Sequence, residues 1–236
     1  MQCVILAAGK GTRLRPLTDT TPKPLVKVGN KTILDHIVSA FPEEIDEIIL
    51  VTNYLEEQIK DYCGDNFHGR KVKYVSQENP AGGTGQALMT AKDLVKGKFL
   101  FMYSDDIHGT EALKKVVKED NAMLATDVPN ASQFGVVYTN EDGYLDKIVE
   151  KPENPNSNLI NIGGFVISPE IFNYKAKVSD SGEAYVTDML TEYAHKNMVK
   201  VIEQDLWLPI GTHEQLLAAE EYLQNTFLKE NTVLHK

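Results

Sequence analysis

Short apolar segments alternate with amphipathic segments along the chain, and turn residues separate them. The apolar segments predict buried strands, and the amphipathic segments predict helices that cover a sheet. In the first half we expect strands near residues 3–7, 47–52, 72–76 and 98–103, and helices near 33–40, 55–62 and 85–95. This alternation is typical of β-α-β units around a mostly parallel sheet, so the predicted class is α/β.

The pattern changes after about residue 120. Gly, Asn and Asp interrupt short apolar runs near 122–126, 135–140, 145–150 and 160–167, which indicates hairpins. Helices are expected near 185–195 and 213–228, with a strand near 199–203. Since no Pro-, Gly- or Ser-rich linker divides the chain, we expect one domain over 1–228. It would have an α/β lobe (about 1–120), a smaller mixed β lobe (about 121–228) and a tail at 229–236.

Charge limits the choice of partners. The 236 residues include 24 Lys and Arg against 34 Asp and Glu, a formal net charge of −10. Such a surface repels the phosphate backbone of nucleic acids, so a nucleic-acid partner is not expected. A protein of this charge that binds small phosphates must concentrate its positive charge locally. Six basic residues lie between Lys10 and Lys31, against the single acid Asp19.

The start of the sequence passes directly into a short apolar strand without a basic leader, so no secretory signal is visible. No run approaches the about 18 apolar residues of a membrane span. The two cysteines, Cys3 and Cys63, have no spacing that suggests zinc or a disulfide framework. We therefore expect a cytoplasmic location without membrane association, and the sequence is compatible with a homo-oligomer.

A glycine-containing loop follows the first strand, and its sequence runs from Leu6 to Thr18 as LAAGKGTRLRPLT. Small residues and glycines let backbone N–H groups approach phosphate oxygens, and Arg13 and Lys23 can add charge to the same anion. The segment is not a P-loop, because no Gly-Lys-Ser/Thr closes it, and the third glycine of a dinucleotide fingerprint is absent. It predicts a triphosphate site. The candidate contacts are Leu6, Ala7, Ala8, Gly9, Gly11 and Thr12.

Two more segments follow predicted strands. Gln77 to Ala87 holds a Gly-Gly-Thr-Gly run, and the Gln77 amide offers both a donor and an acceptor, which suits the edge of a pyrimidine. Asp105 and Asp106 follow the apolar strand that ends at Tyr103. Ligands of α/β proteins usually bind at the carboxyl ends of strands, and hard cations prefer carboxylate oxygens.

Taken together, Leu6–Thr18 and Pro22–Leu25 resemble the signature of the sugar-1-phosphate nucleotidylyltransferases, which include glucose-1-phosphate thymidylyl- and uridylyltransferases. The resemblance implies a three-layer Rossmann-like sheet of the nucleotide-diphospho-sugar transferase type, with a smaller mixed β lobe for the sugar. It also implies that Arg13 and Lys23 hold the triphosphate and act in transfer. Gln77, Gly83 and Thr84 would recognise the base, and Asp105 would bind Mg²⁺.

By the same resemblance, four residues of the second half would hold the sugar 1-phosphate. Lys151 would pair with the phosphate, while Glu150, Asn161 and the backbone of Gly135 would hold hydroxyl groups. Ser104 stands where the family has Gly. Pro209 stands where the family has a second metal-binding Asp. Asp105 is therefore expected to be the only protein carboxylate on Mg²⁺. Asp205 is the nearby acid that a shift in register would bring to the position of the second Asp.

The implied reaction joins a nucleoside triphosphate, with UTP or dTTP favoured, to a sugar 1-phosphate, with glucose 1-phosphate favoured, and releases pyrophosphate. Two alternatives stay open. One is a cytidylyltransferase that acts on phosphocholine or a similar small phosphate, and the other is a non-catalytic nucleotide-binding regulatory relative. Because the hexapeptide repeats of bifunctional relatives are not present in the sequence, acetyl transfer is not expected.

Overall fold

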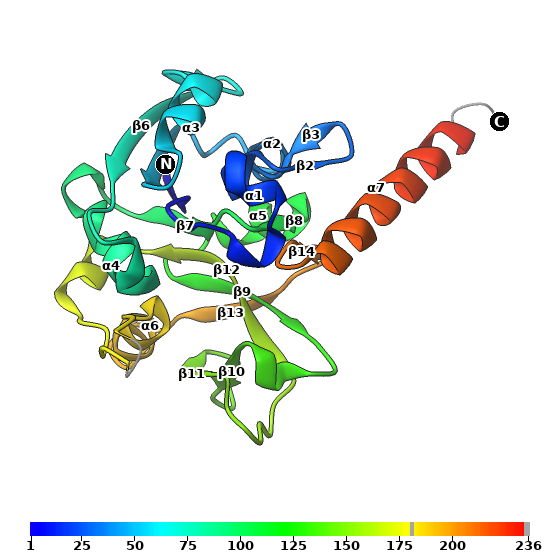
Figure 1. Ribbon diagram of the computed structural model, residues 1–236. Helices are drawn as coiled ribbons and strands as arrows, with labels where there is room; N and C mark the ends of the chain where they lie inside the picture. Colours follow the sequence, from blue (N-terminus) through cyan, green and yellow to red (C-terminus); the bar gives the residue numbers. More distant parts are fainter. Residues whose placement is uncertain (180–181, 234–236) are drawn as a thin grey trace.

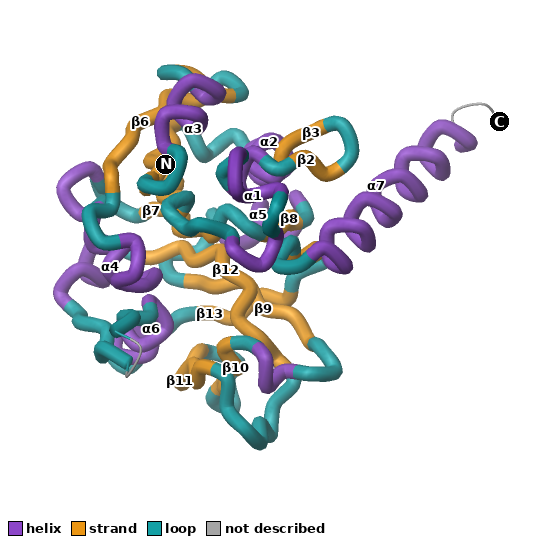
Figure 2. The backbone as a smooth tube through the Cα atoms, viewed as in Figure 1, coloured by secondary structure: helices purple, strands orange, loops and turns teal. Residues whose placement is uncertain are grey.

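The fold is built around a mixed sheet, shown in Figures 1 and 2 for the computed structural model, which describes residues 1–179 and 182–233. The strands are β1 (Gln2–Leu6), β2 (Lys27–Val28), β3 (Lys31–Thr32), β4 (Glu47–Thr52), β5 (Asn66–Phe67), β6 (Arg70–Ser76), β7 (Phe99–Tyr103), β8 (Asp106–His108), β9 (Ala122–Asp127), β10 (Gly135–Thr139), β11 (Leu145–Glu150), β12 (Leu159–Ile167), β13 (Lys200–Glu203) and β14 (Trp207–Pro209).

Ten of these strands, within the described residues, form one sheet in the order β11-β10-β12-β7-β1-β4-β6-β5, and β9 joins β12 to β13. β1 is parallel to both β4 and β7, whereas β12 is antiparallel to β7. The second half of the chain is thus hydrogen-bonded directly to the parallel strands of the first half. Two further pairs, β2 with β3 and β8 with β14, lie outside this sheet.

Helices cover both faces of the sheet. They are α1 (Leu17–Thr20), α2 (Ile33–Ser39), α3 (Glu56–Cys63), α4 (Gly83–Thr90), α5 (Thr110–Val116), α6 (Val186–Ala194) and α7 (His213–Val233), with 3₁₀ turns at Thr12–Leu14, Lys23–Leu25, Pro80–Gly82, Lys92–Leu94, Ala131–Gln133 and Pro169–Asn173. Successive residues of β1 face opposite sides, so Cys3 and Ile5 join the core under α2 and α5, whereas Val4 joins the core under α4 and α6. The predicted three-layer α/β architecture is confirmed.

Most elements lie where the hydrophobic pattern predicts them. The strands at 47–52 and 145–150 have the predicted bounds, and the helix expected at 85–95 begins at Gly83 and ends as a 3₁₀ turn. The pattern did not predict α5, β8 or β14. Helix α7 continues to Val233, so the expected tail is helical over 229–233; residues 234–236 lie outside the described part. Figure 1 shows α7 projecting away from the body of the molecule.

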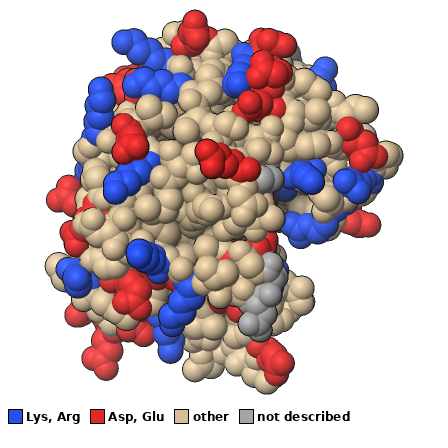
Figure 3. Space-filling view, turned by 60° about the vertical axis from the view of Figure 1, so that its left-hand side comes forward, with Lys and Arg blue, Asp and Glu red and all other residues tan. Residues whose placement is uncertain are grey.

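Charged residues of both signs, which are frequent in the sequence, lie on the surface. Basic and acidic side chains are intermingled on the face shown in Figure 3. Across the described residues, no helix combines the length and the apolar content that crossing a bilayer requires.

Candidate active site

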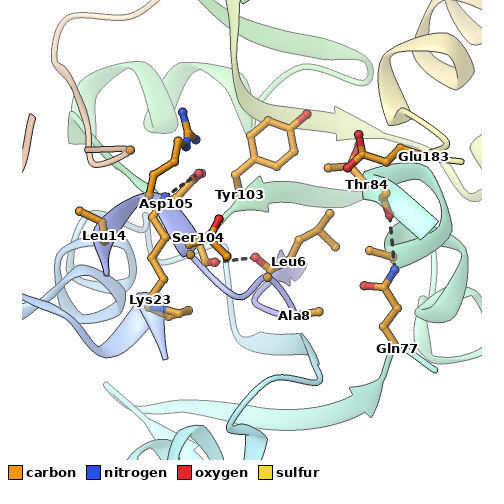
Figure 4. Close-up of a pocket in the computed structure, with 18 residues that line it drawn as sticks. Leu6, Ala8, Leu14, Lys23, Gln77, Thr84, Tyr103, Ser104, Asp105 and Glu183 are labelled. Carbon is orange, nitrogen blue, oxygen red and sulfur yellow. Dashed lines mark hydrogen bonds and ion pairs between the residues drawn. The ribbon is translucent and has the colours of Figure 1, made fainter. Parts of the chain in front are cut away.

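A pocket of about 430 Å³ opens at the carboxyl ends of β1 and β7, beside the loop that follows β6. This is the edge where ligands of α/β proteins usually bind. The residues that line it, shown in Figure 4, are Leu6, Ala8, Gly9, Gly11, Thr12, Arg13, Leu14, Lys23, Pro24, Gln77, Gly83, Thr84, Ala87, Tyr103, Ser104, Asp105, Glu183 and Gly211. The pocket therefore brings together Arg13, Lys23 and Asp105 with most of the predicted loop residues.

The two glycines of the loop have different structural roles. Gly11 has φ 61°, and a Cβ there would lie 3.0 Å from Lys23 Cβ and 3.1 Å from Thr18 Cγ2. The Thr18 hydroxyl also donates to the Gly11 carbonyl at 2.8 Å. At Gly9, by contrast, a Cβ would meet no heavy atom within 4 Å. Gly11 thus lets the loop pack closely on Lys23, whereas Gly9 leaves open space in the pocket.

Ala7 is an exception among the predicted loop residues. It is 1% exposed, and its backbone N–H donates to the Val51 carbonyl at 2.7 Å. It does not line the pocket, in contrast to its neighbours Leu6 and Ala8. Because the N–H of Ala7 is already used to extend the β1–β4 pairing, this N–H is not available to a phosphate, and the contact of Ala7 with the nucleotide stays a prediction.

Lys23 and Asp105 form an ion pair inside the pocket, with Nζ and Oδ2 2.9 Å apart. Lys23 is only 9% exposed, since the 3₁₀ turn at Lys23–Leu25 packs against the glycine loop. Burial would raise the pKa of the Asp105 carboxyl, but the charges of Lys23, Arg13 and His108, together with the Lys23 hydrogen bond, hold that pKa below its ordinary value. Asp105 is therefore an anion beside two cations.

Asp106 has a different environment. Its Oδ2 accepts a hydrogen bond from the Trp207 indole at 2.9 Å, and it does not line the pocket. Burial and the neighbouring charge of Asp105 raise the pKa of Asp106 well above its ordinary value. Pro209 lies directly across from Asp106 in the β8–β14 pair, so the position at which the resemblance implies a second carboxylate is next to this acid.

Asp205 is not available to replace the missing carboxylate. Its Oδ1 accepts the backbone N–H of Ala112 at 3.1 Å, and a Cβ on Gly109 would lie 2.6 Å from its Oδ2. The side chain therefore caps the start of α5. Among the described residues no group of three or more His, Cys, Asp and Glu side chains is arranged to hold a metal. A Mg²⁺ ion that keeps its waters and uses phosphate oxygens needs only one or two carboxylates, so Asp105 fits such an ion.

Gln77 lies at the opposite end of the pocket from Lys23 (Figure 4). It is 2% exposed, and its amide nitrogen donates to the carbonyls of Asn79 at 3.0 Å and Gly83 at 3.4 Å. These bonds fix the orientation of the amide and leave its oxygen as the acceptor. Such an acceptor suits the N3–H of uracil or thymine.

Within the Gly-Thr-Gly run at residues 83–85, Gly83 and Thr84 line the pocket, and the run also packs against the segment 184–186. A Cβ on Gly83, where φ is 80°, would lie 2.6 Å from the Ala184 carbonyl oxygen. Gly85 N donates to that carbonyl at 2.8 Å, and Thr84 Oγ1 accepts from Val186 N at 3.0 Å. The start of α4 is therefore held against the segment 184–186 of the second half.

None of the four predicted sugar-binding residues lines this pocket, but Glu150 and Asn161 interact with the lining residue Tyr103. Gly135 and Glu150 are partners in the β10–β11 pair, and Thr187 donates to Glu150 at 2.9 Å. Burial raises the pKa of Glu150. Asn161 accepts from Gly163 N at 2.9 Å within an irregular part of β12, and Lys151, with φ 43°, follows β11.

Tyr103 connects these residues to the pocket. It lines the pocket at the end of β7, and a Cβ on Gly163 would lie 2.9 Å from its ring. Burial and the charge of Glu150 raise the pKa of Tyr103 well above its ordinary value, while a hydrogen bond with Asn161 opposes the rise. The hydrophobic pattern places Tyr103 only at the end of a strand. Its position immediately before Ser104 and Asp105 is the feature of the sequence that could have identified Tyr103 as a pocket residue.

Six other pocket residues were also not predicted, namely Leu14, Pro24, Ala87, Ser104, Glu183 and Gly211. Ser104 is 7% exposed and donates to the Leu6 carbonyl at 2.6 Å, which ties the ends of β7 and β1 together. Glu183 and Gly211 enter the pocket from the second half of the chain. Both lie far in sequence from the glycine loop, and no periodicity in the sequence indicates that their segments reach this pocket.

Comparison with known proteins establishes the family. The model of the nucleotidyl transferase family matches residues 2–226, and the chain belongs to this family. The chain is 37% identical to the "Bifunctional protein GlmU" of Methanocaldococcus jannaschii over 99% of its own length, but it spans only 59% of that relative. It is 35% identical to the "UTP--glucose-1-phosphate uridylyltransferase AglF" of Haloferax volcanii, with 95% of this chain and 97% of that protein covered.

Solved structures agree with the fold. A putative glucose-1-phosphate thymidylyltransferase from Bacillus anthracis, in complex with a sucrose, matches with a TM-score of 0.82 and 26% identity over 94% of each chain. A UDP-glucose pyrophosphorylase complexed with UDP-glucose matches with a TM-score of 0.81 at 22% identity, over 95% of this chain and 98% of that chain. The resemblance to sugar-1-phosphate nucleotidylyltransferases is thus confirmed at the level of family and fold.

Proposed function

We propose that the chain transfers a nucleotidyl group from a nucleoside triphosphate to a sugar 1-phosphate and releases pyrophosphate. The observation that carries this proposal is the convergence of Arg13, Lys23 and Asp105 in one pocket beneath the glycine loop. UTP or dTTP is the favoured nucleotide, because backbone carbonyls occupy the amide nitrogen of Gln77 and its oxygen is left to accept from the N3–H of uracil or thymine. Glucose 1-phosphate is the favoured acceptor, and the full-length relative from Haloferax volcanii carries a name with both UTP and glucose 1-phosphate.

The pocket divides between base and phosphates. Gln77, Gly83 and Thr84 hold the base at one end, and the loop residues Leu6, Ala8, Gly9, Gly11 and Thr12 line the path to the other end. There Arg13 and Lys23 supply positive charge to the triphosphate. The sugar 1-phosphate lies on the other side of Tyr103, where Gly135, Glu150 and Asn161 meet its hydroxyls and Lys151 meets its phosphate.

The reaction is an in-line displacement at the α-phosphorus. An oxygen of the sugar phosphate forms the new P–O bond, and the bond to pyrophosphate breaks. Because the nucleophile is already an anion, no general base is required. The chain's task is to align two anions that repel each other, and alignment of reactants can contribute on the order of 7–11 kcal/mol. Arg13 and Lys23 stabilise the charge that develops in the transition state.

Mg²⁺ bound to Asp105 and to phosphate oxygens would neutralise further charge on the triphosphate. Lys23 holds Asp105 in its ionised form for this purpose. We further propose that residues 1–228 act as one nucleotidyltransferase domain, with small-molecule phosphates and no nucleic acid as partners. We also propose a cytoplasmic location.

The direct test is pyrophosphate release by the purified chain with Mg²⁺. Each nucleoside triphosphate is combined with glucose 1-phosphate, N-acetylglucosamine 1-phosphate, mannose 1-phosphate and phosphocholine. We expect release with UTP or dTTP and a sugar 1-phosphate, and none without an acceptor. Release with CTP and phosphocholine alone would favour the cytidylyltransferase alternative. Nucleotide binding without release for any acceptor would favour a regulatory relative.

A further inference from the structure

The segment 210–215, which joins β14 to the first turn of α7, contacts both loops that carry the charged site residues. Ile210 N donates to the Asp105 carbonyl at 3.0 Å. The His213 ring donates from Nε2 to the Arg15 carbonyl at 2.8 Å, although 198 positions separate the two residues in sequence. The segment therefore bridges the acid loop after β7 and the glycine loop after β1.

Gly211 lies at the centre of this bridge and lines the pocket. Its N–H donates to Gln215 Oε1 at 2.7 Å. A Cβ on Gly211 would lie 2.7 Å from that same Oε1 and 3.4 Å from Arg13 Nη2. The guanidinium of Arg13 thus lies next to the position where a side chain at Gly211 would begin, and the Gln215 amide lies beside the same position.

An exposed arginine samples many rotamers, so the surface that it lies against determines where its guanidinium points. We infer that Gln215 and Gly211 are positioning residues, which direct the Arg13 guanidinium toward the phosphates of the nucleotide. This inference rests on the proposed function, since it takes Arg13 as a phosphate-binding residue. It assigns a role in the nucleotide site to the first turn of the C-terminal helix.

A simple helix cap is the competing explanation for Gln215. A residue at the third helical position often folds back to bond a backbone N–H at the cap. Here Thr212 already caps the helix, because its hydroxyl accepts from Gln215 N at 3.3 Å and its carbonyl accepts from Leu216 N at 3.0 Å. The Gln215 side chain reaches past Thr212 to Gly211. A cap would affect only stability, whereas a positioning residue affects phosphate binding.

The experiment uses the full chain and inorganic tripolyphosphate, a probe that needs neither base recognition nor turnover. Gln215→Met keeps the length of the side chain but loses the acceptor oxygen. Gly211→Ala displaces Gln215 and crowds Arg13, and the backbone at Gly211 is not in the left-handed region. Gln224→Met, at an exposed position of the same helix, is the matched control. Binding is measured by calorimetry, and Tm is measured alongside.

Both site variants should bind tripolyphosphate about tenfold more weakly than the control, as expected when a charged contact is misdirected. Their KM for the nucleoside triphosphate should rise while KM for the sugar phosphate stays unchanged. Binding as tight as that of Gln224→Met, or a wild-type chain that does not bind tripolyphosphate, would overturn the inference. If the wild type binds tripolyphosphate in a Gln215-dependent way but releases no pyrophosphate with any acceptor, the transfer reaction is refuted and the positioning role is not.

Discussion

Replacing Lys23 by Met separates the catalytic charge of this residue from its packing. Methionine keeps most of the aliphatic stem, which packs against Gly11, but it removes the ammonium group that lies 2.9 Å from Asp105. The ion pair is partly open to solvent, with side-chain exposures of 11% for Lys23 and 38% for Asp105. Pairs of this kind contribute about 1 kcal/mol or less to folding, so the variant should fold.

The expected effect on catalysis is much larger. Loss of one preorganised group that stabilises transition-state charge costs about 2.7–4 kcal/mol, which corresponds to a fall in kcat of about 10²- to 10³-fold. Without Lys23 the pKa of Asp105 should also rise, because the Lys23 charge is the largest effect that opposes the rise in pKa caused by burial. Both changes weaken the site while leaving the core intact.

The assay compares kcat from pyrophosphate release with the free energy of unfolding in urea. Lys73→Met is the matched control, because Lys73 Nζ also lies 2.9 Å from a carboxylate, that of Glu47, but outside the pocket. We expect similar stabilities for the two variants and a large loss of kcat only in Lys23→Met. A Lys23→Met enzyme whose kcat equals that of Lys73→Met would refute the role assigned to Lys23.

Three further predictions concern stability. Gly83→Ala should lower the free energy of unfolding by at least about 2 kcal/mol more than the control Gly143→Ala. Both glycines have φ near 80°, but only at Gly83 would a Cβ meet backbone, at Ala184. Equal urea midpoints for the two variants would contradict this. Ser104→Ala leaves the Leu6 carbonyl without its donor and should cost about 1 kcal/mol, which is about 2–4 °C in Tm by calorimetry; an unchanged Tm would count against it. Burial favours a raised pKa at Asp35, but hydrogen bonds from His68, Tyr62 and Thr32 hold that pKa below its ordinary value. The lowered pKa of Asp35 stabilises the folded chain above the pKa that this carboxyl has in the unfolded chain, and the stabilisation is lost as pH falls. Asp35→Asn should therefore show a weaker decline in unfolding free energy between about pH 5 and pH 2 than the wild type. Parallel declines would exclude the Asp35 contribution.

The sequence was informative where local pattern determines structure. Buried strands such as 47–52 are recognisable because apolar residues are continuous between turn residues. The glycine loop could be placed near Lys23 and Asp105, since parallel strands end at the same edge of a sheet. The sequence pattern did not show that the Ala7 N–H continues the strand pairing beyond β1, where it donates to the Val51 carbonyl.

Contacts between distant segments could not be read from the sequence. Gly83 packs on Ala184, and Gly211 lies under Arg13; each contact depends on how the second half folds back onto the first. Helix α5 was missed for the same reason, because its start is capped by Asp205, 93 positions from the Ala112 N–H that it accepts. Tertiary contacts of this kind leave no periodicity in the sequence.

The proposed reaction forms a bond in this pocket between the α-phosphorus of a nucleotide and an oxygen of a sugar phosphate. Phosphorus NMR of the wild-type chain with UTP, glucose 1-phosphate and Mg²⁺ observes that bond directly. We expect the signals of both substrates to fall together while pyrophosphate and a coupled pair of sugar-diphosphate signals rise in equal amounts. Phosphate or pyrophosphate that appears from UTP while the glucose 1-phosphate signal stays constant would contradict the proposed reaction.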